Sequence, residues 1–321
     1  MVTLMESTRT GHGTVAEALE PLLGRIFGDG VPVEMRFWDG SAYGNASVGV
    51  VEFKRPEALR RIVWSPDELG VARAYVAGDV DVRGDMIDML RALQVGVDGD
   101  LTAILRAAPE LVKVTRSVGG LGTPPKPPAE EVVPHGIRHS LRRDRVAVGH
   151  HYDVGNDFYR LLLGPSMTYS CARFTAPDTS LEAAQAAKHE LICRKLGLDQ
   201  PRAGAGRRRL LDVGCGWGSM VIHAATEHDV DAVGVTISDE QAAHARQRVD
   251  ELGLADRVEI RLQDYREVDD GPYDAISSVG MAEHVGHRRM PTYFQRLFDL
   301  VAPGGRLLNH AIASVGGSRL G

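Results

Sequence analysis

The sequence predicts an α/β protein with a doubly wound, mostly parallel sheet, preceded by a smaller α+β domain. Three observations predict this fold. From about residue 180 onward, short apolar runs typical of buried strands alternate with segments of helix length. A glycine-rich turn follows the first of these runs, as in folds that bind a ligand at a strand–helix junction. A proline- and glycine-rich stretch near residue 125 separates this pattern from a first block with its own helix and strand signals.

The first block has the pattern of a small α+β domain. Apolar residues at helical spacing predict a helix over residues 14–27. Residues 33–37 alternate between apolar and polar, which predicts a strand with one buried face. Turn-forming residues at 40–45 then lead to a predicted returning strand over 48–53. Residues 65–68, Ser-Pro-Asp-Glu, form a helix-start pattern in which the serine is the expected capping residue.

In the second block, strands and helices are expected in alternation. Thr179 and Glu182 can cap a helix toward Lys195, with Gly197 just past its end. The expected later elements are strands over 210–213, 232–237, 258–262, 273–279 and 305–312, with helices from about residue 219 and over 239–252.

These patterns divide the chain into three parts: an α+β domain over 1–116, a Pro/Gly-rich linker over 117–134 and the larger α/β domain over 135–321. Basic residues gather just after the linker. They form either a solvated helix face or a contact for anionic lipid headgroups. The arginines concerned are Arg138, Arg142, Arg143 and Arg145.

Composition removes several functional classes. The net charge of −6 gives no general reason to expect nucleic-acid binding. The three cysteines show no CxxC pairing, so we expect neither a disulfide scaffold nor a metal site. The first residues lack the apolar segment of a signal peptide, and no apolar run approaches the ~20 residues that span a bilayer. We therefore expect a cytoplasmic protein whose membrane contact is peripheral.

The most informative local segment is LDVGCGWG at residues 211–218. Its glycines follow the pattern GxGxG, and Ser219 stands where a dinucleotide fingerprint has its third glycine. Asp212 would repel a pyrophosphate, whereas it suits a cationic ligand or fixes the loop that binds one. No P-loop motif is present. A tight turn with a purely structural role is the alternative.

This segment resembles motif I of the class I S-adenosylmethionine methyltransferases, which have a Rossmann-like core. Further motifs narrow the resemblance: HYDVGNDFY at 151–159, MTYSC at 167–171, VTIS at 235–238, QDY at 263–265 and EHVG at 283–286. In this order they resemble the cyclopropane-fatty-acyl-phospholipid synthase family. That family includes the mycolic acid cyclopropane synthases and the methyltransferases that make 10-methyl-branched fatty acids.

The resemblance implies roles for particular residues. Cys171, Glu283, His310 and the backbone around Ile312 match the bicarbonate-binding cluster of the family, with bicarbonate as the base. The alternatives are a buried inert thiol at Cys171, a surface carboxylate at Glu283 and a core histidine at His310. The residues implied to bind S-adenosylmethionine are Tyr169, Ser170, Asp212, Gly214, Gly216, Thr236, Gln241, Asp264 and Tyr265.

The implied reaction transfers a methyl or methylene carbon to the cis double bond of an unsaturated phospholipid acyl chain. It passes through a carbocation and gives a cyclopropane or a 10-methylene product, which a partner reductase can turn into a methyl branch. The first domain is expected to serve lipid binding or oligomerisation, and the chain either forms a homo-oligomer or does not. Two other hypotheses are an N- or O-methyltransferase of the same fold and a non-catalytic lipid-binding protein.

The sequence departs from the family pattern at its end. It stops at Gly321, soon after the fifth expected strand of the core. The last two strands of a class I methyltransferase sheet and a later tyrosine of the bicarbonate cluster are missing, so we expect a truncated chain. Ala282 also stands where family members carry a larger apolar residue.

Overall fold

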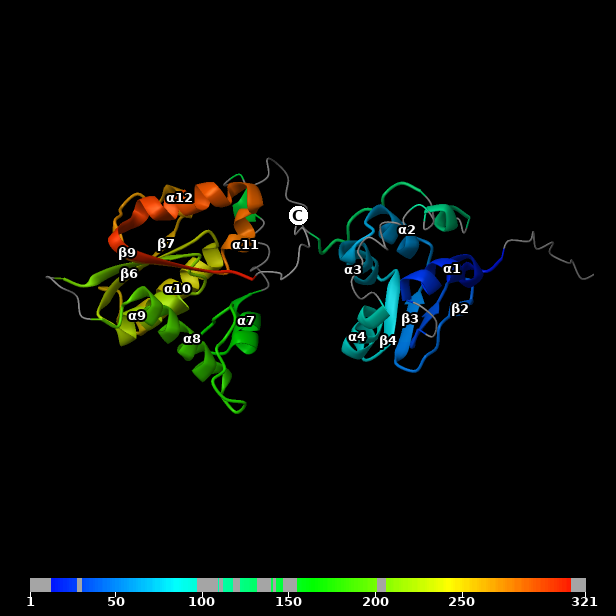
Figure 1. Cartoon of the computed structure of the whole chain (residues 1–321), viewed down its shortest axis with the longest axis horizontal. Coiled ribbons are helices and arrows are strands. Elements are labelled where there is room, and N and C mark those ends of the chain that lie inside the picture. Colours follow the sequence, from blue (N-terminus) through cyan, green and yellow to red (C-terminus); the bar gives the residue numbers. More distant parts are fainter. Residues whose placement is uncertain are drawn as a thin grey trace, which may run out of the picture. The chain divides into compact units, whose positions relative to one another are not determined.

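The chain divides into two compact units, Met1–Val132 and Val133–Gly321, each with a hydrophobic core of its own (Figure 1). The computed structural model describes residues 13–27, 31–96, 109, 112–117, 122–131, 140, 143–146, 155–200 and 206–312.

The first unit has a four-stranded sheet in the order β2-β1-β3-β4. Its core forms where apolar side chains of α1 meet the sheet, because α1 buries the helical stripe that includes Leu19 and Leu22. The elements are α1 (Val15–Phe27), β1 (Val33–Arg36), β2 (Ala42–Tyr43), β3 (Gly49–Phe53), α2 (Glu57–Trp64), α3 (Glu68–Val76), β4 (Val80–Gly84) and α4 (Met86–Gly96).

Two expectations for this unit are wrong. β3 runs parallel to β1 rather than returning along it, because the predicted turn contains the short strand β2, which pairs antiparallel with β1 and reverses the chain once more. The cap of α3 is Asp67, whose carboxylate accepts a hydrogen bond from the Gly70 N–H at 3.2 Å. Ser65 instead ends α2 and donates its hydroxyl hydrogen to Asp67 at 2.7 Å, so the helix begins two residues later than its pattern indicates.

The described part of the proline-rich stretch, residues 122–131, lies against α2 and α3 of the first unit. The Trp64 indole donates to the carbonyl of Gly122 at 3.0 Å, and Arg61 donates to the carbonyl of Lys126 at 2.7 Å. Arg73 forms an ion pair with Glu131. The first two contacts satisfy backbone carbonyls of a stretch whose prolines keep it out of helix and sheet.

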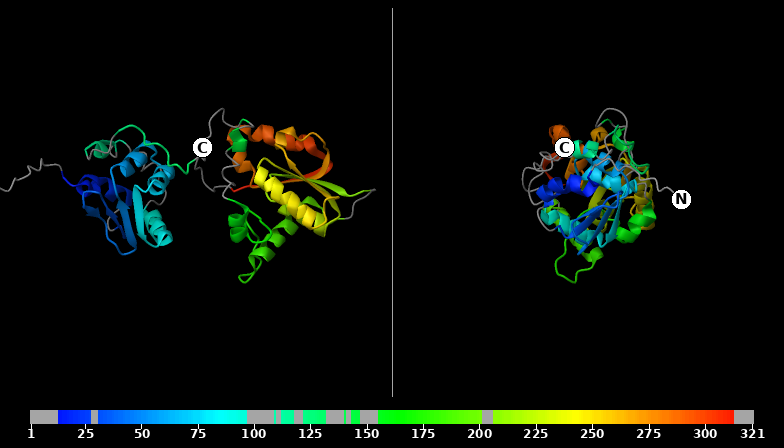
Figure 2. Two further views of the ribbon diagram at one scale, coloured as in Figure 1. Left: turned by 180° about the vertical axis from the view of Figure 1, so that it is seen from behind. Right: turned by 90° about the vertical axis from the view of Figure 1, so that its right-hand side faces the viewer.

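The second unit confirms the predicted α/β fold. Its five strands form a parallel sheet in the order β7-β6-β5-β8-β9. α10, yellow in Figure 2, lies along this sheet. The strands are β5 (Arg208–Val213), β6 (Val230–Thr236), β7 (Val258–Leu262), β8 (Tyr273–Val279) and β9 (Val301–His310). The helices are α7 (Asn156–Leu163), α8 (Leu181–Leu196), α9 (Ser219–Glu227), α10 (Asp239–Glu251), α11 (Ala282–Val285) and α12 (Met290–Leu300), with 3₁₀ turns η1 (Tyr265–Glu267) and η2 (His287–Arg289).

Alternate residues of the central strand pack on opposite faces of the sheet. Leu210 packs with α8, α9 and α10, whereas Leu211 belongs to the cluster that includes α12. Strands buried on both faces explain the nearly continuous apolar runs of the sequence. α8 ends at Gly197 as expected, in the left-handed region at φ 75°, but its cap is Ser180 rather than Thr179. Within the described residues, no helix combines the length and the apolar character needed to cross a membrane.

Candidate active site

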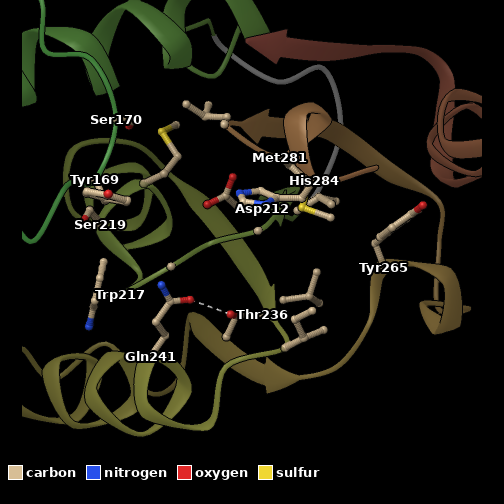
Figure 3. A pocket seen from close by; sticks show the side chains of 18 of the residues that line it. Tyr169, Ser170, Asp212, Trp217, Ser219, Thr236, Gln241, Tyr265, Met281 and His284 are labelled. Atoms are coloured by element: carbon tan, nitrogen blue, oxygen red, sulfur yellow. Dashed lines mark hydrogen bonds between the residues drawn. The ribbon is translucent and has the colours of Figure 1, made fainter. Parts of the chain in front are cut away.

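A cavity of about 330 Å³ opens at the carboxyl ends of β5, β6 and β8 in the second unit (Figure 3). The chain runs from β5 outward to β6 and β7 and then returns to β8 on the other side of β5. Ligands of doubly wound sheets bind at this switch point, because the loops on either side of it diverge. The residues predicted for cofactor binding all line the cavity: Tyr169, Ser170, Asp212, Gly214, Gly216, Thr236, Gln241, Asp264 and Tyr265.

The glycine-rich turn brings bare backbone to the cavity. Gly214 and Gly216 have φ values of +79° and +56°, in the left-handed region that favours glycine. The Gly214 N–H donates to the carbonyl of Val235 at 3.0 Å, which joins the turn to β6. A Cβ atom on Gly216 would have no neighbour closer than the Gln241 side-chain nitrogen at 4.0 Å. A ligand can therefore approach the backbone closely at Gly216.

Asp212 supplies a buried carboxylate beside this turn. Its Oδ1 accepts a hydrogen bond from the Ser277 hydroxyl at 2.6 Å. Burial raises the pKa of Asp212 to about 6, and the Ser277 hydrogen bond and Lys188 oppose that shift. Burial also lowers the pKa of Lys188 to about 8, and its ammonium donates to the Ser170 hydroxyl at 2.7 Å. The site therefore holds a carboxylate that a cationic ligand would stabilise in its ionised form.

Two further walls carry polar groups. The Thr236 hydroxyl donates to the side-chain carbonyl of Gln241 at 2.9 Å, which leaves the Gln241 amide nitrogen near Gly216 (Figure 3). On the other side, the Asp264 carboxylate accepts hydrogen bonds from the backbone N–H and the guanidinium of Arg266. Arg266 also pairs with Asp144 at 3.1 Å. The Asp264 wall is thus held by an ion-pair network before any ligand binds.

An aromatic wall closes the side formed by the segment before α8. The Tyr169 ring lies edge-on to those of Tyr159 and Trp217, with centroids 5.5 and 6.4 Å away. The Trp217 indole donates to the Asn156 side chain at 2.7 Å, which joins the glycine-rich turn to the first residue of α7. This contact gives Asn156 of the HYDVGNDFY motif a definite structural role: it fixes the orientation of Trp217.

The predicted catalytic cluster lies outside this cavity wall. The Ile312 N–H donates to the Glu283 carboxylate at 2.7 Å, so these two predicted residues are brought together. Cys171 is exposed, which contradicts the buried-thiol alternative. His310 is also exposed rather than a core residue, and its carbonyl accepts from the Gly280 N–H at 2.9 Å. Within the described part of the chain, the cavity lining does not include any of the four.

The basic residues after the linker have different surroundings. Arg138 and Arg142 lie outside the described residues. Arg143 lines the cavity together with Asp144, and Arg145 is exposed. Of the described pair, only Arg145 has the exposure expected of a headgroup contact.

Many residues that line the cavity were not among the predicted site residues, and four of them show why. Trp217 and His284 lie inside motifs that had been recognised, so their neighbours could have indicated them. Met281 lies two residues before the EHVG motif. Lys188 carried no signal, because it comes from the middle of an ordinary helix, α8. Only the fold brings it to the cavity.

Comparison with known proteins identifies the family. A family model described as mycolic acid cyclopropane synthetase matches residues 139–319. The chain belongs to this family. A probable fatty acid methyltransferase, Rv3720, of Mycobacterium tuberculosis (strain ATCC 25618 / H37Rv) is 41% identical over 294 residues, which cover 88% of this chain and 66% of that protein. The cyclopropane-fatty-acyl-phospholipid synthase of Escherichia coli (strain K12) is 35% identical over 277 residues, covering 86% of this chain and 64% of the enzyme.

The chain thus spans just under two thirds of the length of these two relatives. Among solved structures, the cyclopropane synthase MmaA2 from Mycobacterium tuberculosis is 40% identical, with a TM-score of 0.48, covering 52% of this chain and 56% of that one.

Proposed function

We propose that this chain binds S-adenosylmethionine and transfers its methyl carbon to the double bond of an unsaturated phospholipid acyl chain. The observation that carries the proposal is the buried Asp212 carboxylate beside the open backbone of Gly216, in a cavity whose size suits a small molecule. A pyrophosphate would be repelled there, whereas a sulfonium or an amino group would be attracted. Membership of the family supports the same assignment.

The residues of the cavity fit this cofactor by their chemistry. Asp212 and the bare Gly216 backbone suit its cationic end. The Gln241 amide, oriented by Thr236, offers a donor for hydroxyl groups, and Tyr265 provides an apolar ring face. When bound, S-adenosylmethionine supplies an electrophilic methyl group. The protein's contribution is to hold that methyl in line with the double bond, which can lower the barrier by up to ~7–11 kcal/mol.

The acyl substrate requires a site that excludes water. Attack by the alkene on the methyl group leaves a carbocation on the acyl chain, and water would capture it, so the site must be dry. Three apolar side chains on α7 are also exposed: Phe158, Leu161 and Leu162, with Leu161 at 90%. Their spacing puts them on one helix face, as in helices that contact lipid. We propose that this face contacts the acyl region of the substrate membrane, with Arg145 near the headgroups.

Proton removal completes the reaction. Loss of a proton from the transferred carbon closes a cyclopropane ring, whereas a prior hydride shift followed by proton loss gives an exocyclic methylene. Cys171, Glu283, His310 and the backbone at Ile312 would hold a bicarbonate ion, which would supply the base. The Glu283–Ile312 hydrogen bond supports this assignment, since it draws the end of β9 toward the EHVG motif. In this scheme Cys171 positions the base and is not a nucleophile.

The test uses S-adenosylmethionine with a fully deuterated methyl group and vesicles of dioleoyl phosphatidylglycerol. We expect acyl chains that gain CD₂, because one deuteron leaves with the base, and fragmentation by mass spectrometry distinguishes a ring from a methylene. The Asp212→Asn variant serves as the control for cofactor-dependent labelling. A chain that binds the cofactor, measured by calorimetry, but labels no lipid contradicts the proposed substrate.

A further inference from the structure

A second group of reactive side chains lies between α8 and α9, and the proposed reaction does not use it. One potential ligand atom each from Cys193, His223 and His228 lies within 4.8 Å of the other two. Cys193 comes from α8, His223 from α9, and His228 directly follows α9. Glu190, one helical turn before Cys193, faces the same two histidines.

The distances within this group resemble those of a metal coordination shell. The Glu190 carboxylate oxygen Oε2 lies 3.0 Å from His228 Nε2 and 3.5 Å from His223 Nε2. In a tetrahedral zinc site with metal–ligand distances of about 2.0–2.1 Å, neighbouring ligand atoms are separated by about 3.3–3.4 Å. The Glu190 contacts are therefore close to this spacing, and the ligand atom of Cys193 lies within 4.8 Å of those of both histidines.

Burial makes these groups suitable ligands. Cys193 is fully buried, and the side chains of His223 and His228 are only 16% and 11% exposed. His223 Nε2 is buried, and its long contact of 3.5 Å with Glu190 Oε2 does not satisfy it as a hydrogen bond. A buried polar atom without a partner costs free energy, and a bound cation would remove that cost.

We propose that Cys193, His223, His228 and Glu190 form a binding site for Zn²⁺. One thiolate, two imidazoles and one carboxylate are a donor set that zinc prefers, and zinc takes four such ligands in a closed structural site. Binding releases the proton of the Cys193 thiol to solvent. Glu190 is the most exposed member, at 31%, so the ion enters from its side and displaces the Glu190–Arg194 ion pair or shares the carboxylate with it.

Such a site would connect two helices that carry cavity residues. α8 presents Lys188 and His189 to the cavity, and the His189 ring lies edge-on to that of His223 at 5.5 Å. α9 begins at the glycine-rich turn. A metal ion that joins α8 to α9 would therefore hold these two walls of the cavity in a fixed relation, without contacting the ligand in it.

The sequence analysis did not predict this group. His223 and His228 are separated by four residues, a spacing that zinc ligands use, but Cys193 lies 30 residues before the first of them and no CxxC pair is present. Only the packing of α8 against α9 brings them together, which is why the sequence led us to expect no metal site.

The test measures metal binding directly and does not depend on turnover. The 321-residue chain is stripped with a chelator and titrated with Zn²⁺ by calorimetry and with Co²⁺ by absorption spectroscopy. We expect one equivalent of Zn²⁺ to bind. Co²⁺ should give the visible bands of a four-coordinate ion and a thiolate charge-transfer band. Cys193→Ser should abolish the charge-transfer band, and His228→Asn should weaken Zn²⁺ binding by more than the ~10–100-fold typical of outer-sphere partners.

Two matched variants serve as controls. Cys171→Ser removes an exposed thiol and His244→Asn removes a half-buried histidine of α10, and both should bind Zn²⁺ as tightly as the unsubstituted chain. Because Cys193 lies in the core, circular dichroism must establish that its variant is folded. His228→Asn and the cobalt spectrum of the unsubstituted chain decide the question if it is not. Binding that is absent, or equally tight in His228→Asn and His244→Asn, overturns the proposal.

Discussion

At the scale of single residues, Asp212 combines a cost in stability with a proposed role in binding. Its pKa rises from 3.8 to about 6 on folding, because the fold buries the carboxylate. The ionised form is therefore disfavoured in the folded state, and above pH 6 this group lowers the free energy of unfolding by roughly 1–3 kcal/mol. The penalty declines as the pH falls from 6 toward 3.8, where the carboxyl is protonated in both states.

The Asp212→Asn variant tests both consequences. We expect it to be more stable than the unsubstituted chain by roughly 1–3 kcal/mol at pH 7.5, and this gain should shrink toward pH 4. It should also bind S-adenosylmethionine at least ~10-fold more weakly at pH 7.5, because the cofactor loses a buried counter-charge. Urea denaturation and calorimetry measure the two effects. A variant that binds normally would show that Asp212 does not hold the cofactor.

Glu283 allows the proposed catalytic cluster to be tested separately from the cavity. Within the described residues it does not line the cavity, so Glu283→Gln should leave cofactor affinity within about twofold while turnover falls at least ~10-fold. The glutamine can still accept the Ile312 hydrogen bond, so the end of β9 should keep its position. Glu251→Gln, on the exposed end of α10, is the matched control. Equal turnover in both variants would remove Glu283 from the mechanism.

The sequence indicated some of these residues and missed others for a physical reason. Asp212 and Gly216 stand in a turn whose geometry depends on local sequence, since left-handed backbone needs glycine. Lys188 enters the cavity from a helix that begins some thirty residues before the turn, and its neighbours in sequence are those of an ordinary helix. Contacts made only by tertiary packing leave no local pattern to recognise.

At the scale of elements, the two sheets also differ in how well local sequence predicted them. β5 to β8 were predicted within two residues of their observed bounds, because burial makes them nearly continuous apolar runs. β9, which has no buried residue, begins four residues before its predicted start. The direction of β3 was wrong, because β2 is only two residues long and lies within an apparent turn. Helix starts were displaced by one or two residues, since serine, threonine and aspartate compete for the capping position.

The exposed face of α7 gives a prediction for a single element. Replacing Leu161 and Leu162 by glutamate should weaken binding to anionic dioleoyl vesicles at least ~10-fold, since it removes apolar area and adds repulsive charge. Vesicle co-sedimentation measures this effect. S-adenosylmethionine affinity should not change, because both side chains point away from the core that contains Tyr159. Arg91→Glu combined with Asp88→Glu on α4 provides a control on another exposed helix. An equal loss of vesicle binding in that variant would indicate that added negative charge alone causes the effect.

At the scale of the whole molecule, the two units contribute unequally to the described cavity. Every residue that lines the cavity falls between Arg143 and Arg289, inside the second unit. The first unit has a core of its own, in which Leu19 and Val33 are almost completely buried, and it also holds residues 122–131 through Arg61 and Arg73. The family model covers residues 139–319, whereas the two relatives compared here align with both units. The described lining of the cavity therefore belongs to the second unit.

This division predicts the behaviour of the second unit expressed as residues 133–321. We expect it to bind S-adenosylmethionine within about threefold of the affinity of the 321-residue chain, because none of the described cavity residues comes from the first unit. Calorimetry at pH 7.5 measures both proteins, and Asp212→Asn in the shorter protein tests whether the same site is used. A folded second unit that has lost the affinity would mean that the first unit contributes to the site, since a cavity built within one unit keeps its binding energy when the other is removed.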